Sequence, residues 1–212
     1  ESAPLNPVSA YAESKIETER QVRPLAGDSF SPVFLRNATA YGASPMLRLD
    51  LVVNNLLATA FATGQIRVMS DGSPWRPLVH CEDIARAFVA FLEAPAAQVH
   101  NMSVNVGGNS ENFQVKDVVQ KVKHVLPDSE VVFTGEVGAD PRNYRVKFDL
   151  LAKTLPDFRL KYTLDLGIEE LLKQLKDKRF SKADLDGNKF IRLRTLKDRL
   201  DRLRLPAGKA PS

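Results

Sequence analysis

The chain has 212 residues, of which 43% are hydrophobic and 26% are charged, and its formal net charge is +4. This length and apolar content suit one domain, or a domain with a tail. The single cysteine, Cys81, excludes an internal disulfide framework and fits a reducing compartment. No apolar run is long enough to predict a membrane span. The first residues do not resemble a signal peptide, so we expect a cytoplasmic protein.

The first third of the chain predicts two helices and two strands. A helix is predicted over residues 9–26, a strand over 31–36, and a loop over 37–49. Asp50 is a plausible N-cap for a helix that runs through Thr63 and ends at Gly64. Residues 66–69 then have the composition of a strand.

The middle of the chain continues the alternation of strands and helices. The predicted strands cover residues 75–80, 102–106 and 130–133, and the predicted helices cover 82–93, 115–125, 150–155 and 168–176. In the helix at 82–93, Ile84, Phe88 and Leu92 share one apolar face. Residues 134–145 form a Gly-containing loop. Such alternation predicts an α/β fold.

The end of the chain departs from this pattern. Leu193, Leu196, Leu200 and Leu203 recur at helical spacing among many Lys and Arg residues. A basic tail can meet nucleic acid or anionic lipid, but no aromatics interleave the charges. We therefore interpret it as a solvated amphipathic helix, with neither nucleic acid nor membrane as a partner. The run at 184–188 looks like a calcium loop, but its twelfth position is Leu193, so no metal is predicted.

Tyr11 and Lys15 are the strongest candidates for chemistry. Their spacing of four residues puts both side chains on one face of a helix, about one turn apart. A positive charge beside a phenol favours the phenolate, which would make Tyr11 a general acid/base near neutral pH. The spacing alone is also typical of a surface Tyr with a solvated Lys, so the motif depends on its context.

The context resembles a known family over five blocks. They are N-P-x-S-x-Y-x-x-S-K-x-x-x-E at 6–19, F-L-R-N-A-T-A-Y-G at 34–42, N-N-L at 54–56, D-G-x-x-x-R-x-x-x-H-x-x-D-x-A at 71–85, and D-P-R at 140–142. In this order they resemble the extended short-chain dehydrogenase/reductases, and more narrowly the NAD-dependent epimerase/dehydratases of nucleotide sugars. The resemblance implies the C-terminal part of a doubly wound Rossmann-type sheet, plus a smaller α/β substrate-binding lobe.

The resemblance implies roles for nine residues. Tyr11 and Lys15 are the catalytic pair that also meets the cofactor, and Asn37 and Ala38 lie at the cofactor. The implied substrate-binding residues are Thr39, Asn54, Asn55, Arg76 and Arg142. The two arginines are implied to bind the diphosphate, because phosphate oxygens accept paired hydrogen bonds from a guanidinium. Thr39 stands where many relatives have Asn, which removes a two-sided amide contact. His80 and Asp83 are interpreted as structural, and Trp75 as either core or base pocket.

No G-x-G-x-x-G fingerprint occurs in the chain. The family places that turn before the tyrosine, so we expect this chain to lack the cofactor half. The expected divisions are a Rossmann remainder at 1–40, a mainly substrate-binding lobe with returning Rossmann elements at 41–178, and a basic helical tail at 179–212.

The implied function is NAD- or NADP-dependent epimerisation or dehydration of a nucleotide sugar, through transient oxidation of a sugar hydroxyl. The resemblance allows a homodimer of the full-length enzyme. Two alternatives remain open. One is a superfamily reductase that acts on a keto-sugar or another carbonyl. The other is a non-catalytic nucleotide-sugar-binding or interaction protein.

Overall fold

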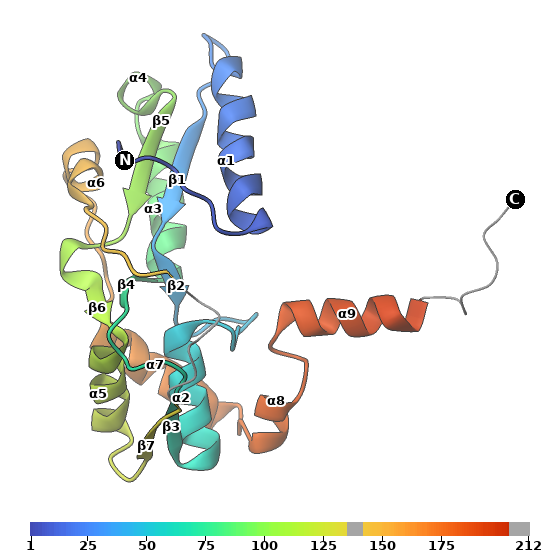
Figure 1. The fold of residues 1–212 in the computed structure, drawn as a ribbon. Helices are drawn as coiled ribbons and strands as arrows, with labels where there is room; N and C mark the ends of the chain where they lie inside the picture. The colour runs from blue at the N-terminus through green and yellow to red at the C-terminus, as the bar shows by residue number, and fades with distance from the viewer. Residues whose placement is uncertain (135–141, 204–212) are drawn as a thin grey trace, which may run out of the picture. The chain divides into compact units, whose positions relative to one another are not determined.

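The computed structural model describes residues 1–134 and 142–203, in two compact units. Unit 1 comprises residues 1–40, 75–113 and 143–164, and unit 2 comprises 41–74, 114–142 and 165–212. Strands and helices alternate along the chain (Figure 1), and β1–β5 and β3–β7 are parallel pairs. Parallel strands joined through helices define the α/β class, which confirms the predicted fold class.

Unit 1 contains most of the chain's strands. Its helices are α1 (Ala10–Val22), η1 (Arg23–Leu25), α3 (Cys81–Glu93), α4 (Ala96–Val99), η2 (Asn109–Glu111) and α6 (Asp149–Thr154). Its strands are β1 (Val33–Asn37) and β5 (Met102–Val106), which pair with each other, and β2 (Thr39–Tyr41), β4 (Trp75–His80) and β6 (Asn112–Gln114), whose order is β2-β4-β6. The strand β2 and the helix α4 were not predicted.

Unit 2 is mainly helical around one strand pair. Its elements are α2 (Val52–Thr63), β3 (Gln65–Val68), α5 (Val115–Val125), β7 (Glu130–Phe133), α7 (Leu164–Asp177), α8 (Lys182–Asp186) and α9 (Arg192–Leu203). Helix α2 contacts β3 and α5, and its inner side chains Val53, Leu56 and Leu57 are buried. As predicted, α2 ends at Gly64, whose φ of 73° is the left-handed conformation that glycine adopts without strain.

The core of unit 1 lies on the β1–β5 pair. The register runs from Val33 opposite Met102 to Asn37 opposite Val106. Figure 1 shows α3 and α6 against these strands, and both helices contact them. Residues of α3, β5 and α6 form one buried cluster, namely Ala87, Phe91, Val104, Val106 and Leu151 with Val99.

The buried face of α3 differs from the predicted one. Asp83, Ala87 and Phe91 are the buried residues of α3, whereas Phe88 and Leu92 are 48% and 83% exposed. The predicted apolar stripe is therefore displaced by one residue around the helix. Ala87 is buried in the core cluster, and the buried Asp83 carries its own hydrogen bonds.

Asp83 joins the start of α3 to the segment that precedes α7. It is fully buried, and its carboxylate accepts hydrogen bonds from the backbone N–H groups of Lys161 (2.8 Å) and Tyr162 (3.0 Å) and from the Arg86 guanidinium (2.6 Å). His80 caps the same helix, because its Nδ1 accepts from the Glu82 N–H at 3.3 Å. Both side chains thus have hydrogen bonds within the fold, as the structural roles predicted for His80 and Asp83 require, because a buried polar group is costly without partners.

Asp50 does not cap α2, contrary to the prediction. The N-cap is Leu51, and no side chain caps the helix. The Asp50 carboxylate is instead bound by the Arg48 guanidinium at 3.0 and 2.6 Å. This hydrogen bond is the main cause that lowers the pKa of Asp50 from 3.8. The local ion pair thus competes with capping for the same oxygens.

Two further predictions concern loops. The calcium-like run at 184–188 instead includes the end of α8, where Asp184 accepts from the N–H and hydroxyl of Ser181 at 3.0 and 2.8 Å as part of a capping box. Of the predicted loop at 134–145, residues 135–141 lie outside the described residues.

Glu19 fixes α1 to the strands of unit 1. Its carboxylate accepts hydrogen bonds from Arg36 on β1 (2.8 and 3.1 Å), from Ser103 on β5 and from Arg23 at the end of the helix (2.6 Å). Burial raises the pKa of Glu19, but the hydrogen bonds from these three donors outweigh it and lower the pKa from 4.5 to about 2. A carboxylate with three donors is stable only when ionised.

We expect Glu19→Gln to lower the free energy of unfolding of unit 1 by about 1–3 kcal/mol near neutral pH, the scale of charged hydrogen bonds. Because the pKa of Glu19 is lowered in the folded state, its stabilisation is present above its unfolded pKa of 4.5 and is lost as the pH falls towards 2. Urea unfolding of both proteins at several pH values measures this difference.

The matched control is Glu17→Gln on the same helix. Glu17 pairs with Arg20 at 2.7 Å, but both side chains are substantially exposed, and such surface pairs contribute little to stability because water screens them. Equal effects of the two substitutions, or a Glu19→Gln effect that does not shrink in acid, would contradict the prediction.

Candidate functional site

Tyr11 and Lys15 share the first turns of α1. Ser9 begins this helix by accepting a hydrogen bond from the Ala12 N–H at 3.2 Å. The Lys15 Nζ lies 5.2 Å from the centroid of the Tyr11 ring, and the Tyr11 side chain is 74% exposed. None of the residues of α1 is buried. The pair is therefore accessible, with the Lys15 ammonium over the ring of Tyr11.

Glu19 is a residue of the first block whose role the sequence analysis missed. It lies one helical turn beyond Lys15, and it holds the exposed α1 against β1 and β5. The signal was present in the sequence, since a glutamate four residues after the lysine ends the N-P-x-S-x-Y-x-x-S-K-x-x-x-E block. Glu19 is a positioning residue for Tyr11 and Lys15, because it fixes the helix that carries them.

Asn37, Ala38 and Thr39 follow the end of β1. Asn37 is exposed at the last paired position, opposite Val106. Ala38 is buried, and its N–H donates to the Val106 carbonyl at 2.9 Å. Thr39 is half-buried at the start of β2. In open parallel sheets, ligands bind beyond the carboxyl ends of the strands, and these three residues lie at such an end.

Arg76 is a buried cation of unit 1. Its side chain lies on β4, the residue is 9% exposed, and its Nη1 donates to the Trp75 carbonyl at 2.8 Å. Trp75 is half-buried. The Arg145 guanidinium lies 4.6 Å from the centroid of the Trp75 ring, and the backbone N–H of Trp75 donates to the Asn143 Oδ1 at 3.0 Å. The contacts of Asn143 and Arg145 had no signal in the sequence, because Asn143 lies 68 positions after Trp75.

Asn54, Asn55 and Arg142 belong to unit 2. Asn54 is buried; its Oδ1 accepts from the Gly42 N–H at 2.9 Å, and its Nδ2 donates to the Arg48 carbonyl at 3.0 Å. Asn55 is exposed, and its Nδ2 donates to the Leu49 carbonyl at 3.0 Å. Both amides thus hold the segment before α2. Arg142 is exposed. A substrate role for these three residues stays a prediction.

Cys81 is half-buried at the first position of α3. In the described part of the chain, His, Cys, Asp and Glu form no group of three or more that could hold a metal ion. Of the helices in residues 1–134 and 142–203, none is both long and apolar enough to cross a bilayer.

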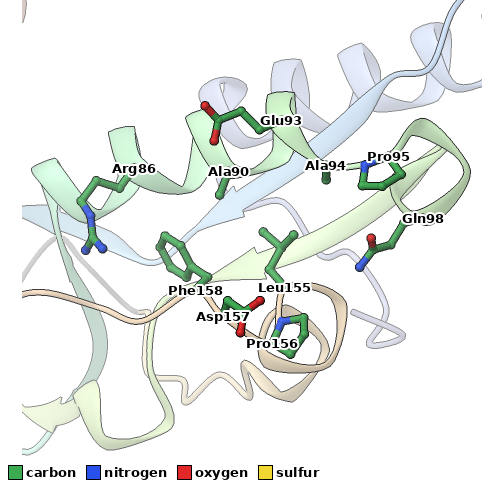
Figure 2. Close-up of a pocket in the computed structure, with 10 residues that line it drawn as sticks. All are labelled: Arg86, Ala90, Glu93, Ala94, Pro95, Gln98, Leu155, Pro156, Asp157 and Phe158. Carbon is green, nitrogen blue, oxygen red and sulfur yellow. The ribbon is translucent and has the colours of Figure 1, made fainter.

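A pocket of about 450 Å³ lies beside α3 in unit 1 and contains none of the nine predicted site residues. Figure 2 shows Leu155 and Phe158 turned towards this helix, and both side chains pack on the core cluster. At the other end, Arg86 lies 5.5 Å from the Phe158 ring centroid and is held by Asp83. The hollow therefore results from how residues 155–158 pack on α3, and it is not the candidate site.

The NAD dependent epimerase/dehydratase family matches residues 1–107, which is half of the chain. The chain belongs to this family. The matched region includes α1 with Tyr11 and Lys15, β1 with the residues that follow it, and β4 with Arg76.

Solved structures with a similar fold come from the same kind of enzyme. The NAD-dependent NDP-hexosamine 5,6-dehydratase TunA is 23% identical with a TM-score of 0.70, covering 84% of this chain and 57% of its own. The Bacillus cereus UDP-glucuronic acid 4-epimerase, in complex with UDP-glucuronic acid and NAD, is 21% identical with a TM-score of 0.69 and coverages of 82% and 54%. The Thermotoga maritima UDP-glucose 4-epimerase, with UDP-glucose, is 21% identical with a TM-score of 0.70 and coverages of 82% and 55%. This chain therefore spans a little over half the length of these enzymes.

Proposed function

We propose that this chain is the part of an NAD(P)-dependent nucleotide-sugar epimerase or dehydratase that carries the proton-transfer pair and the substrate-binding residues. The observation that carries the proposal is the exposed Tyr11 with the Lys15 ammonium beside its ring, on a helix fixed by Glu19. Family membership supports it. The nucleotide sugars bound by the similar enzymes support the substrate class.

Tyr11 is the proposed acid/base. Its phenolate takes the proton of a sugar hydroxyl when the carbon beneath is oxidised, and returns it when that carbon is reduced. The Lys15 ammonium lies 5.2 Å from the ring centroid of Tyr11. Because Glu19 binds Arg36 and Ser103, the helix keeps its place while the proton moves. Such fixed geometry is what acid/base catalysis requires.

The chemistry of the donors in unit 1 fits one side of an NAD(P) site. The Lys15 ammonium can donate to a ribose hydroxyl, and Asn37 and Ala38 lie where a parallel strand ends, which is the usual position of a dinucleotide. When bound, the cofactor supplies the hydride acceptor. Its pyrophosphate normally rests on a Gly-rich turn at a helix N-terminus, and no such turn occurs in these 212 residues.

Arg76 and Arg142 are the proposed diphosphate ligands. A guanidinium can donate two parallel hydrogen bonds to phosphate oxygens. Arg76 is largely shielded from water, which strengthens any contact with an anion. Thr39, Asn54 and Asn55 are proposed to contact the sugar or its phosphates. The homodimer of the complete enzyme and the cytoplasmic location stay predictions.

In the natural full-length polypeptide, Tyr11→Phe should reduce turnover of its nucleotide sugar by about 10²–10⁴-fold, because the proton-transfer group is lost. Binding of the nucleotide sugar should change little. Steady-state kinetics and calorimetry measure the two quantities. Tyr144→Phe is the control, since Tyr144 is also a partly exposed tyrosine (40%). Full turnover by Tyr11→Phe would make the motif structural.

The same assays separate the alternatives. A reductase would consume one NAD(P)H for each carbonyl reduced, whereas an epimerase or dehydratase regenerates its cofactor and consumes none. A non-catalytic binding protein would bind nucleotide sugar in calorimetry and convert none of it.

Arg76→Ala should weaken nucleotide-sugar binding to the full-length polypeptide by about 1.5–3 kcal/mol, the scale of a hydrogen bond to a charged group. Arg76→Lys keeps the charge but loses the paired donors, and should lie between wild type and Arg76→Ala. Calorimetry with several nucleotide sugars measures the affinities. Arg67→Ala on the exposed side of β3 is the control. Unchanged affinity in both Arg76 variants, with unchanged thermal midpoints, would remove Arg76 from the site.

The 212-residue chain alone should neither bind NAD(H) saturably nor turn over substrate. It has Tyr11 and Lys15, but no dinucleotide fingerprint to hold the pyrophosphate. Titration of NADH fluorescence and chromatography of nucleotide sugars check the two expectations. The Thermotoga maritima UDP-glucose 4-epimerase serves as the positive control. Micromolar NADH affinity of the chain alone would contradict the prediction.

A further inference from the structure

Helix α9 exposes a row of leucines in the spacing of a coiled-coil seam. Leu193, Leu196, Leu200 and Leu203 are separated by three, four and three residues, which is the a, d, a, d order of a heptad repeat. Their side chains are 76%, 54%, 51% and 76% exposed, and none of the residues of α9 is buried. The seam is therefore an uncovered apolar face in the described part of the chain.

The helix is too short to owe its stability to propensity alone. Its 12 residues are at the lower limit for an isolated helix in water. Local bonds hold the start of the helix: the Thr195 hydroxyl donates to the Asn188 carbonyl at 2.5 Å, and the Asn188 amide donates to Asp198. Burial of the leucine seam would supply the missing stabilisation.

The charges beside the seam determine which partner fits. With Leu193 at position a, the flanking g positions are Arg192 and Arg199, and the flanking e position in the described helix is Lys197. All three are basic. The two acids, Asp198 and Asp201, fall at f and b, away from the seam. Residues at e and g select the partner in coiled coils, so this seam selects acidic flanks.

A second copy of α9 does not fit this requirement. In a parallel pair, Arg192 would face Lys197 of the other copy, and in an antiparallel pair arginine would face arginine. Like charges placed opposite each other oppose association. A bilayer fits less well than a helix, because the apolar arc is as narrow as an a/d seam and α9 has no aromatic residue.

We propose that α9 is a docking helix for another polypeptide, which supplies an amphipathic helix with apolar a and d positions and acidic e and g positions. This inference does not depend on the proposed enzymatic function. Leucines exclude water at the contact, and the basic flanks pair with the partner's carboxylates and set its identity and register.

The test uses two designed peptides with identical leucine heptads as probes, one with Glu and the other with Lys at e and g. The full chain should bind the Glu peptide saturably in fluorescence anisotropy, more weakly as salt is raised, and should not bind the Lys peptide. Leu196→Asn with Leu200→Asn should weaken binding by about tenfold or more, because buried apolar area is lost and two amides are desolvated. Leu166→Asn on α7, at equal exposure (50%), is the control.

A triple charge reversal (Arg192→Glu, Lys197→Glu and Arg199→Glu) should switch the preference to the Lys peptide. Circular dichroism and thermal midpoints check that each variant folds, which is expected because the altered side chains are exposed. Failure of the wild-type chain to bind the Glu peptide would overturn the proposal. So would equal binding of both peptides, leucine-dependent binding to phosphatidylserine vesicles without peptide binding, or self-association through the leucines.

Discussion

The hydrogen-bonded carboxylate of Glu19 is the interaction on which the candidate site depends. Helix α1 has no buried residue, so apolar packing does little to hold it in place. Its attachment to the strands comes from the Glu19 carboxylate, which binds Arg36 of β1 and Ser103 of β5, and from Arg23 at the end of the helix, which also donates to Ser103. Because the Glu19 carboxylate is ionised well into acid, the attachment persists over the pH range in which a tyrosine phenol can act as a base.

A second carboxylate organises the other side of unit 1. Asp83 is inaccessible to water and receives two backbone N–H groups and one guanidinium. Asp83 accepts hydrogen bonds from residues 161 and 162, and these bonds hold α3 to a segment nearly eighty positions later in the chain. Glu19 and Asp83 show the same physical solution, in which several donors meet one carboxylate. Single substitutions at such positions leave donors without acceptors, so their cost exceeds that of surface charges.

The candidate site and the leucine seam of α9 are both exposed, but their side chains differ in chemistry. Tyr11 and Lys15 are polar and exposed on a helix that is fixed by ionic hydrogen bonds, as reacting groups must be. The seam of α9 is apolar and exposed on a helix that buries none of its residues. Such an exposed apolar surface is typical of an interaction site. The two features belong to different units and need not act together.

The sequence by itself determined the order of most strands and helices, the family, and the candidates for chemistry. Periodicity and turn residues are local, so the strand at 102–106 and the helix that ends at Gly64 could be predicted from neighbours along the chain. The Tyr11–Lys15 pair is equally local, since one helical turn fixes their proximity.

Only the tertiary structure decided what contacts residues distant in sequence. It selected Asp83, Ala87 and Phe91 as the buried face of α3, because β1 and β5 present a surface that a small side chain fits, whereas the apolar pattern favoured Ile84, Phe88 and Leu92. It also decided between short-range alternatives, because the Asn54 amide binds Gly42 and Arg48, and the Asp50 carboxylate binds Arg48 instead of a helix end. It also gave Glu19 its donors, because Arg36 and Ser103 reach it only when β1 and β5 pair beside α1. Hydrogen-bond partners across such separations depend on strand pairing, which no local pattern encodes.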